Sequence, residues 1–202
     1  MKKILYLVLS LTLLQAQAQE NYGYLSWNLN VPLSNTEWLD ATSSAGGKLG
    51  FRFMLRDTRF SVGVDFNWAT YDQYEPTQTF EQPGGSITTD YFKYVYNYGI
   101  VVSGQYNVPL GDNERFYYYG GLGLGANSNT YSLYYNIYEE SYRKTGFLVR
   151  PEAGIIARFG RRRSFGAIAA VHYDFSTNKI KEFNYSNFTN IGFQLGVIIM
   201  NR

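Results

Sequence analysis

The chain has 202 residues, and its 18 basic and 16 acidic side chains leave a formal net charge of only +2 at pH 7. This balance argues against a nucleic-acid partner, and the absence of cysteine excludes disulfide bonds and thiolate metal sites. A content of 20 Tyr, 14 Phe and 20 Gly with only 5 Pro is typical of a chain made of strands.

The N-terminus has the layout of a secretory signal peptide. Two lysines precede an apolar run of eleven residues from Ile4 to Leu14, and a small-residue cleavage motif ends at Ala18. The run is too short for a membrane-spanning helix, which needs roughly 20 apolar residues. We therefore expect residues 1–18 to be removed on export, which leaves residues 19–202 as a single domain with equal numbers of basic and acidic side chains.

Eight later segments alternate apolar and polar residues with a period of two, the pattern of a strand that has one apolar and one polar face. The segments are 22–31, 47–56, 60–69, 91–107, 116–127, 145–159, 165–175 and 191–199. Each has about the ten residues that a tilted strand needs to cross an outer membrane. The clearest pair forms the hairpin 91–127, in which the turn residues Pro109, Gly111, Asp112 and Asn113 separate two arms.

The connections between these segments alternate in length. Those after the second, fourth and sixth segments are short, whereas those after the first, third, fifth and seventh run to roughly a dozen residues or more. Short turns on one side and long loops on the other are typical of outer-membrane barrels, whose long loops face outside the cell. We therefore expect both termini of the exported domain in the periplasm.

The two strand faces decide between a membrane barrel and a soluble, lipocalin-like ligand-binding barrel. The apolar face carries about five bulky residues on each strand, too many for the inside of an eight-stranded barrel, which ordinary side chains already fill. The Gly, Ala, Ser and Asn residues of the opposite face would fit there. The sequence therefore predicts an all-β fold, an eight-stranded antiparallel up-and-down transmembrane β-barrel with its apolar face toward lipid.

Four segments resemble the outer membrane beta-barrel family common in Bacteroidetes-type bacteria, eight-stranded relatives of the OmpA transmembrane domain and OmpX. They are SVGVDFNW at 61–68, YNVPLGDNERFYYYGGLGLG at 106–125, RPEAGIIARF at 150–159 and NIGFQLGV at 190–197. The likeness covers nearly the whole exported domain. It implies a barrel fold and an outer-membrane location, and most members of the family have no assigned reaction.

The inward face carries charged residues that we expect to form one polar network in the lumen, the space inside the barrel. They are Lys48, Arg52, Asp65, Arg150, Glu152, Arg158, His172 and Asp174. The second hairpin brings Lys48 and Arg52 near Asp65. Because buried charges without partners are very costly, these groups should pair with one another and fill the lumen. A small-solute pore is the alternative.

The turn between the sixth and seventh segments sets the pairing within this network. A turn centred near residue 162 places Arg150 opposite Asp174 and Glu152 opposite His172. Opposed residues of neighbouring strands have Cβ atoms about 5 Å apart, within reach of a direct contact.

His172 is the only histidine, and it shares one strand face with Asp174 and Ser176, a pattern that invites comparison with lipid A-modifying barrel enzymes. Alternate residues of a strand lie about 6 to 7 Å apart, too far for a proton relay. The inward face also points away from lipid. We therefore predict no enzyme activity, no catalytic residue, no cofactor and no metal site; the glycine run 121–125 precedes no helix that could bind phosphate.

The segment 129–142 is rich in tyrosine. Its members are Tyr131, Tyr134, Tyr135, Tyr138 and Tyr142. Such a loop could present an aromatic platform to a glycan or to a host surface, because tyrosine combines a large contact area with a low entropy cost. The alternative, which we favour, is that the fifth and sixth strands extend beyond the membrane and pair.

These observations predict a monomeric integral outer-membrane protein with a structural or surface-interaction role. Its expected partners are outer-membrane lipid and lipopolysaccharide, the barrel assembly machinery and, through the loops, a glycan or a host surface. No nucleic-acid partner is expected.

Overall fold

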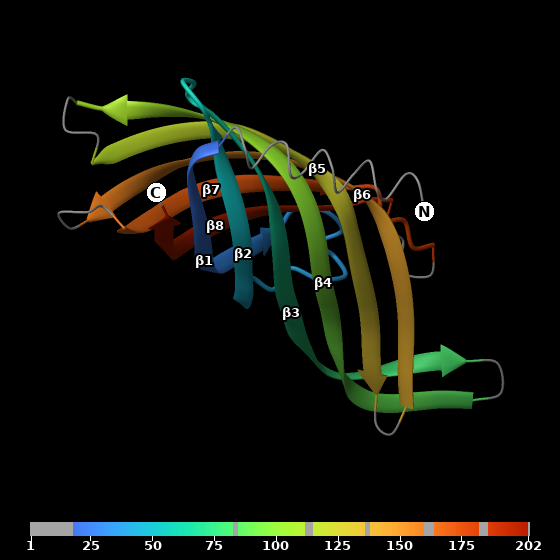
Figure 1. Ribbon diagram of the computed structural model, residues 1–202. Helices are drawn as coiled ribbons and strands as arrows, with labels where there is room; N and C mark the ends of the chain where they lie inside the picture. The colour runs from blue at the N-terminus through green and yellow to red at the C-terminus, as the bar shows by residue number, and fades with distance from the viewer. Residues whose placement is uncertain are drawn as a thin grey trace, which may run out of the picture.

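The structure is a computed structural model that describes residues 18–82, 85–111, 115–135, 138–159, 164–181 and 186–201. Eight antiparallel strands close into one barrel (Figure 1), so the predicted all-β fold is confirmed. The strands are β1 (Ala18–Pro32), β2 (Ser43–Leu55), β3 (Phe60–Gln82), β4 (Gly85–Leu110), β5 (Phe116–Tyr135), β6 (Tyr138–Phe159), β7 (Phe165–Ser176) and β8 (Phe188–Asn201). No helix among the described residues is long and apolar enough to cross a membrane.

The barrel closes between its first and last strands. β1 pairs with β8 from Asn21 opposite Asn201 to Pro32 opposite Asn190. Every other strand pairs with its neighbours in sequence, so the backbone N–H and C=O groups of the ring find partners within the sheet. The ring therefore exposes no strand edge at the height of the lipid, where unpaired backbone groups would be costly.

The outward side chains form an apolar band around the barrel. Leu122 on β5 and Val197 on β8 are 52% and 60% exposed, whereas the inward Lys48 on β2 and Gln194 on β8 are 0% and 1% exposed. Aromatic side chains border the band at both ends, as in other membrane barrels. They include Trp27, Trp68 and Tyr98 at one end and Phe60, Tyr106 and Phe159 at the other. The polar face lies inside, as the alternation predicts.

The interior is built in layers. The lower apolar layer lies near the short turns and the strand ends of β1 and β8, and consists of Tyr22, Tyr24, Tyr117, Tyr119, Ile156, Ile168, Ala170, Ile198 and Met200. The lid, at the opposite end, consists of Leu39, Ala69, Tyr71, Val95, Tyr131, Ile180 and Phe188. Charged and amide side chains fill the space between these two apolar layers.

Strands occupy two of the four connections expected to be long loops; between the fifth and sixth segments this is the paired ribbon that we favoured, whereas between the third and fourth the expectation of a loop is wrong. β3 continues to Gln82 and β4 begins at Gly85, while β5 continues to Tyr135 and β6 begins at Tyr138. The outward side chains of these added segments are largely polar, so they lack the apolar alternation of a lipid-facing strand. We call the part of β3–β6 from the row of Thr70, Tyr96, Thr130 and Arg143 onward the extension.

The extension projects well past the rest of the barrel. Figure 1 shows the β3–β4 hairpin reaching furthest and turning away from the barrel. The register of β3 and β4 shifts between Glu75 and Gln78, around Pro76. Such a bulge bends a strand, and proline is tolerated there because it has no N–H to pair.

Two predictions from the sequence concern residues that the structure does not describe. Residues 1–17, which make up nearly all of the expected signal peptide, and the turn residues Asp112 and Asn113 lie outside the described residues. Ala18 already belongs to β1.

Among the short turns, Asp57 and Gly111 adopt positive φ angles of 57° and 75°, the left-handed conformation that is common in tight turns.

Candidate functional site

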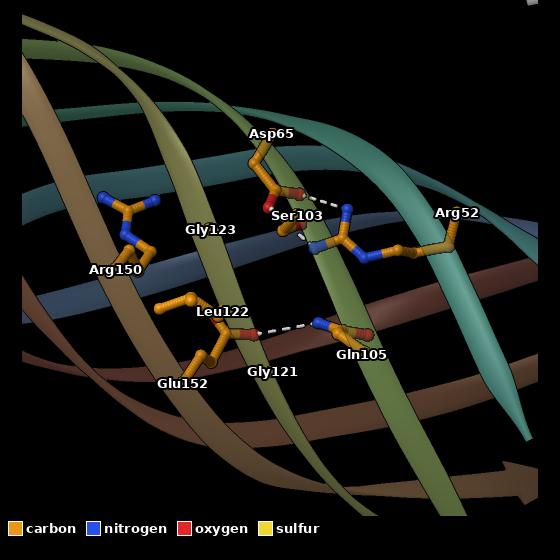
Figure 2. A pocket seen from close by; sticks show the side chains of 9 residues that line it. All are labelled: Arg52, Asp65, Ser103, Gln105, Gly121, Leu122, Gly123, Arg150 and Glu152. Carbon is orange, nitrogen blue, oxygen red and sulfur yellow. Dashed lines mark hydrogen bonds and ion pairs between the residues drawn. The ribbon is translucent and has the colours of Figure 1, made fainter.

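The charged interior of the barrel is the candidate site, and its first element is an ion pair between β2 and β3. Arg52 donates from Nη1 and Nη2 to the two carboxylate oxygens of Asp65, at 2.7 and 2.6 Å (Figure 2). The hydroxyls of Tyr24 and Ser103 also donate to this carboxylate, at 2.5 and 3.1 Å. The fork of a guanidinium matches the two oxygens of a carboxylate, which makes this the strongest kind of side-chain pair.

A second ion pair joins β6 and β7. Arg150 donates from Nε and Nη2 to the two oxygens of Asp174, at 2.5 and 2.7 Å. Both side chains are almost fully buried. The β6–β7 register also sets Glu152 opposite His172, as the position of the turn predicts.

The third ion pair crosses the lumen. Lys48 on β2 contacts the carboxylate of Glu152 on β6, and these two strands stand on opposite sides of the eight-stranded ring. Tyr119 donates to the other oxygen of Glu152 at 2.7 Å, and Gln105 approaches the same oxygen at 3.4 Å (Figure 2). The sequence placed both Lys48 and Arg52 near Asp65. Asp65 pairs with Arg52, as expected, whereas the ion-pair partner of Lys48 is Glu152.

Three buried cations therefore meet three buried anions in the centre of the barrel. A small cavity between them, lined by Arg52, Asp65, Arg150 and Glu152 among others, measures about 10 Å³. That volume holds about one water molecule. Glycine on the inward face makes room for the network, since a methyl group at Gly50 would lie 2.2 Å from a ring carbon of Tyr24.

The remaining two candidates, Arg158 and His172, form none of these three ion pairs. The guanidinium of Arg158 stacks over the ring of Tyr117, with its carbon 4.4 Å from the ring centroid, in the lower apolar layer. His172 is 2% exposed, and its Nδ1 atom has no hydrogen-bond partner; the same holds for the hydroxyl of Ser176. His172 and Ser176 are therefore not hydrogen-bonded to each other, as a nucleophile and its general base would be.

An amide layer above the charges was not anticipated from the sequence. Asn67 donates to Asn97 at 3.4 Å, Asn97 donates to Asn129 at 2.8 Å, and Asn129 donates to the hydroxyl of Tyr131 at 3.0 Å. The chain of hydrogen bonds runs across β3, β4 and β5. In the sequence, the amide layer could have been predicted from the asparagines that recur at the inward-facing positions of these strands.

The lid closes the far end of the lumen. Leu39, from the β1–β2 connection, and Ile180 and Phe188, from the β7–β8 connection and the start of β8, are fully buried. Phe188 packs edge-on against Tyr71 and Tyr131, with ring centroids 5.7 and 6.4 Å apart. This layer was hard to predict, because Leu39 and Ile180 come from irregular connections, and Ala69, Tyr71, Val95 and Tyr131 are isolated apolar residues on the inward face of β3, β4 and β5.

The five tyrosines of segment 129–142 do not gather into one exposed platform, the alternative that we did not favour. Tyr131 is 0% exposed and belongs to the lid, and Tyr142 packs against the lid. Tyr134 and Tyr135 instead bond to Glu139 and Glu140 on β6, at 2.9 and 2.8 Å. β5 and β6 stay paired to the tip, with Tyr135 opposite Tyr138, so the favoured alternative of a paired ribbon is confirmed.

Among the described residues, no group of three or more His, Asp or Glu side chains is placed to hold a metal ion. The carboxylates of the network are instead occupied by arginine, lysine and hydroxyl donors. Chemically, the arrangement can cross-link the wall of the barrel and block its lumen.

A closed eight-stranded barrel with an apolar belt and a polar interior defines the class of outer-membrane β-barrel proteins. Residues 4–198 match the family described as "Outer membrane protein beta-barrel domain", and the chain belongs to this family. The resemblance seen in the sequence is confirmed at that level. No curated protein matches the chain.

One solved structure shows the same fold at low sequence identity, and two others match the chain over most of its length. The Neisserial surface protein A (NspA) is 11% identical, with 89% of this chain and 95% of that chain covered and a TM-score of 0.53. Ail of Yersinia pestis is 15% identical, with 90% and 98% covered and a TM-score of 0.48. The N-terminal β-barrel domain of Pseudomonas aeruginosa OprF is 12% identical, with 89% and 97% covered and a TM-score of 0.43.

Proposed function

We propose that this protein is a monomeric outer-membrane anchor with a blocked lumen, which presents the extension of β3–β6 outside the cell and acts as a structural or surface-interaction protein. The observation that carries this proposal is the filling of the interior along its length. The lower apolar layer, the three ion pairs, the amide layer and the lid follow one another through the barrel.

The central ion pairs support a structural role more than a transport role. The contact between Lys48 and Glu152 joins opposite walls, so a solute would have to break a buried ion pair to pass. Leaving either charge without its partner in a water-poor interior is strongly unfavourable. The network therefore favours a permanent cross-link between opposite walls of the barrel.

The two ends of the barrel differ, and this difference supports the proposed orientation in the membrane, with the extension outside the cell. The chain enters β1 and leaves β8 at the end that also carries the short turns, including Asp57 and Gly111. The extension and the two loop segments of the lid lie at the other end. Short turns of membrane barrels face the periplasm, so we place the termini there and the extension at the cell surface. A signal peptide over residues 1–18 would direct the export.

The chemistry of the interior supports a function without catalysis. His172, the residue most suited to acid–base work, is buried inside the barrel, where lipid cannot reach it. The partners that fit this proposal are outer-membrane lipid, lipopolysaccharide, the barrel assembly machinery and a glycan or host surface at the extension. Membership of the Bacteroidetes-type group rests on the four sequence segments and is part of the proposal.

Single cysteines test the display of the extension, because the native chain contains none. Tyr138→Cys lies at the tip of the β5–β6 hairpin of the extension and Asp57→Cys in a short turn, and both positions are exposed. A membrane-impermeant maleimide applied to intact cells should label Tyr138→Cys only, and lysed cells should show labelling of both. Labelling of Asp57→Cys on intact cells would reverse the proposed orientation.

A further inference from the structure

A column of aromatic side chains runs along the outward side of the extension. We call Tyr74, Phe92, Tyr94, Tyr96 and Tyr134 the aromatic face. Tyr94 stacks on Tyr96 with ring centroids 5.9 Å apart and an interplanar angle of 5°, and Phe92 stacks on Tyr94 at 6.5 Å. Tyr74 contacts Phe92 at 5.1 Å, and Tyr134 meets Tyr94 edge-on at 5.6 Å. Tyr74 and Phe92 are 55% and 42% exposed.

The cross-strand neighbours show that this column stands above the hydrocarbon layer. Tyr96 lies between Thr70 and Thr130, and Tyr94 lies between Asp72 and Ser132. An exposed carboxylate at this level is incompatible with lipid tails, whereas the row of Trp68 and Tyr98 below still matches an aromatic girdle.

The height of the column follows from strand geometry. Phe92 is six residues beyond Tyr98 along β4. With about 3.4 Å per residue and a strand tilt of about 40°, Phe92 stands roughly 15 Å further from the membrane centre than the girdle. At that height the molecules beside the barrel are the sugars of lipopolysaccharide, whose lipid tails pack on the apolar band below.

The chemistry of the face suits sugar rings. Tyrosine and phenylalanine offer flat apolar surfaces for the C–H faces of sugars, and the hydroxyls of Thr70 and Thr130 and the carboxylate of Asp72 offer hydrogen bonds to the sugar hydroxyls. Among the outward residues that lie opposite the aromatic face on β3, β5 and β6, Arg143 is the single basic residue. The negative charges of Asp72 and Glu139 offset its positive charge. This balance favours neutral sugars over phosphate groups, which need clustered positive charge.

We propose that the aromatic face binds the core oligosaccharide of neighbouring lipopolysaccharide, and so holds the extension upright in the sugar layer. The face points outward from the barrel, and along β4 its column Tyr96, Tyr94 and Phe92 follows directly on Tyr98 of the lipid-contacting band. Its occupant is therefore the sugar of the same molecules whose lipid tails contact that band. This proposal deepens the proposed surface-interaction role and rests on it.

The test uses the folded full-length barrel in detergent and core oligosaccharide freed from lipid A, so that partition into lipid cannot mimic binding. Calorimetric titration should show binding to the wild type, and the variant carrying Tyr74→Ser, Phe92→Ser and Tyr94→Ser should bind at least tenfold more weakly. Tyr74→Ser alone, at the most exposed position, should bind measurably more weakly, which keeps the test decisive if the triple variant does not fold. Tyr138→Ser is the matched control, since Tyr138 is also 55% exposed but lies off the face.

The outcomes separate this proposal from the one on which it rests. Equal affinity of the wild type and the Tyr74→Ser variant, or no binding to the wild type, would overturn the sugar-binding face while leaving the cysteine-labelling result intact. Binding of a mammalian N-glycan without binding of the core oligosaccharide would overturn lipopolysaccharide as the occupant. An equal loss in the Tyr138→Ser control would move the binding surface to the hairpin tip.

Discussion

The ion pair between Lys48 and Glu152 gives the sharpest prediction about stability. The side chain of Lys48 is fully buried and that of Glu152 is 5% exposed. Lys48→Met would leave the carboxylate of Glu152 with hydrogen bonds from Tyr119 and Gln105 but no cation partner. Removing one member of a buried pair costs roughly 3 to 5 kcal/mol, and because Tyr119 still donates to the carboxylate we expect about 3 kcal/mol.

A double variant distinguishes the cost of an unpaired buried charge from the cost of losing the whole ion pair. Lys48→Met combined with Glu152→Gln removes both charges and keeps an acceptor for Tyr119, so the free energy of unfolding should fall by only about 1 kcal/mol. Urea unfolding in lipid vesicles, followed by the gel migration of the folded form, measures both variants. The exposed pair of Arg56 and Asp57, at 3.6 Å, provides a control, and Arg56→Met should leave stability unchanged. Wild-type stability of the Lys48→Met variant would refute the cross-lumen pair.

Three further perturbations probe the outer face, the packing of the lumen and the lid. Val197→Arg places a charge in the lipid band and should lower the free energy of unfolding by about 2 to 4 kcal/mol, a loss that an unchanged urea midpoint would rule out. Gly50→Ala should destabilise the barrel by about 1 to 3 kcal/mol through the clash with Tyr24, whereas Gly120→Ala, whose methyl group would meet nothing within 4 Å, should be neutral; equal urea midpoints would contradict the packing. Phe188→Ala should cost about 3 to 5 kcal/mol in the same assay but open no conductance, because the charged layer below stays closed.

The period of two was enough to predict the barrel and the direction of each side chain. It placed Lys48, Arg52, Asp65 and Asp174 on the inward face, where all four are buried. It could not give the partner of Lys48, because that partner lies across the lumen, and its choice depends on the diameter of the closed ring and the stagger of its strands.

The sequence analysis missed the extension of β3 for a different reason. Beyond Trp68 the outward positions of β3 become Thr70, Asp72 and Tyr74, so the apolar alternation that marks a strand in lipid ends although the strand continues. Cross-strand pairing with β4 sustains the strand there, and pairing of that kind is visible only once the register is known. The same limit hid the lid, because Leu39 lies in a connection without strand alternation, where nothing in the sequence shows which side chains turn inward.

The blocked lumen is the central claim, and single-channel recording in planar bilayers tests it most directly. The purified, folded protein should insert without stable conductance steps, since the Lys48–Glu152 contact, the lower apolar layer and the lid close the barrel in series. Stable, large conductance steps from the folded monomer would contradict the account and establish a small-solute pore.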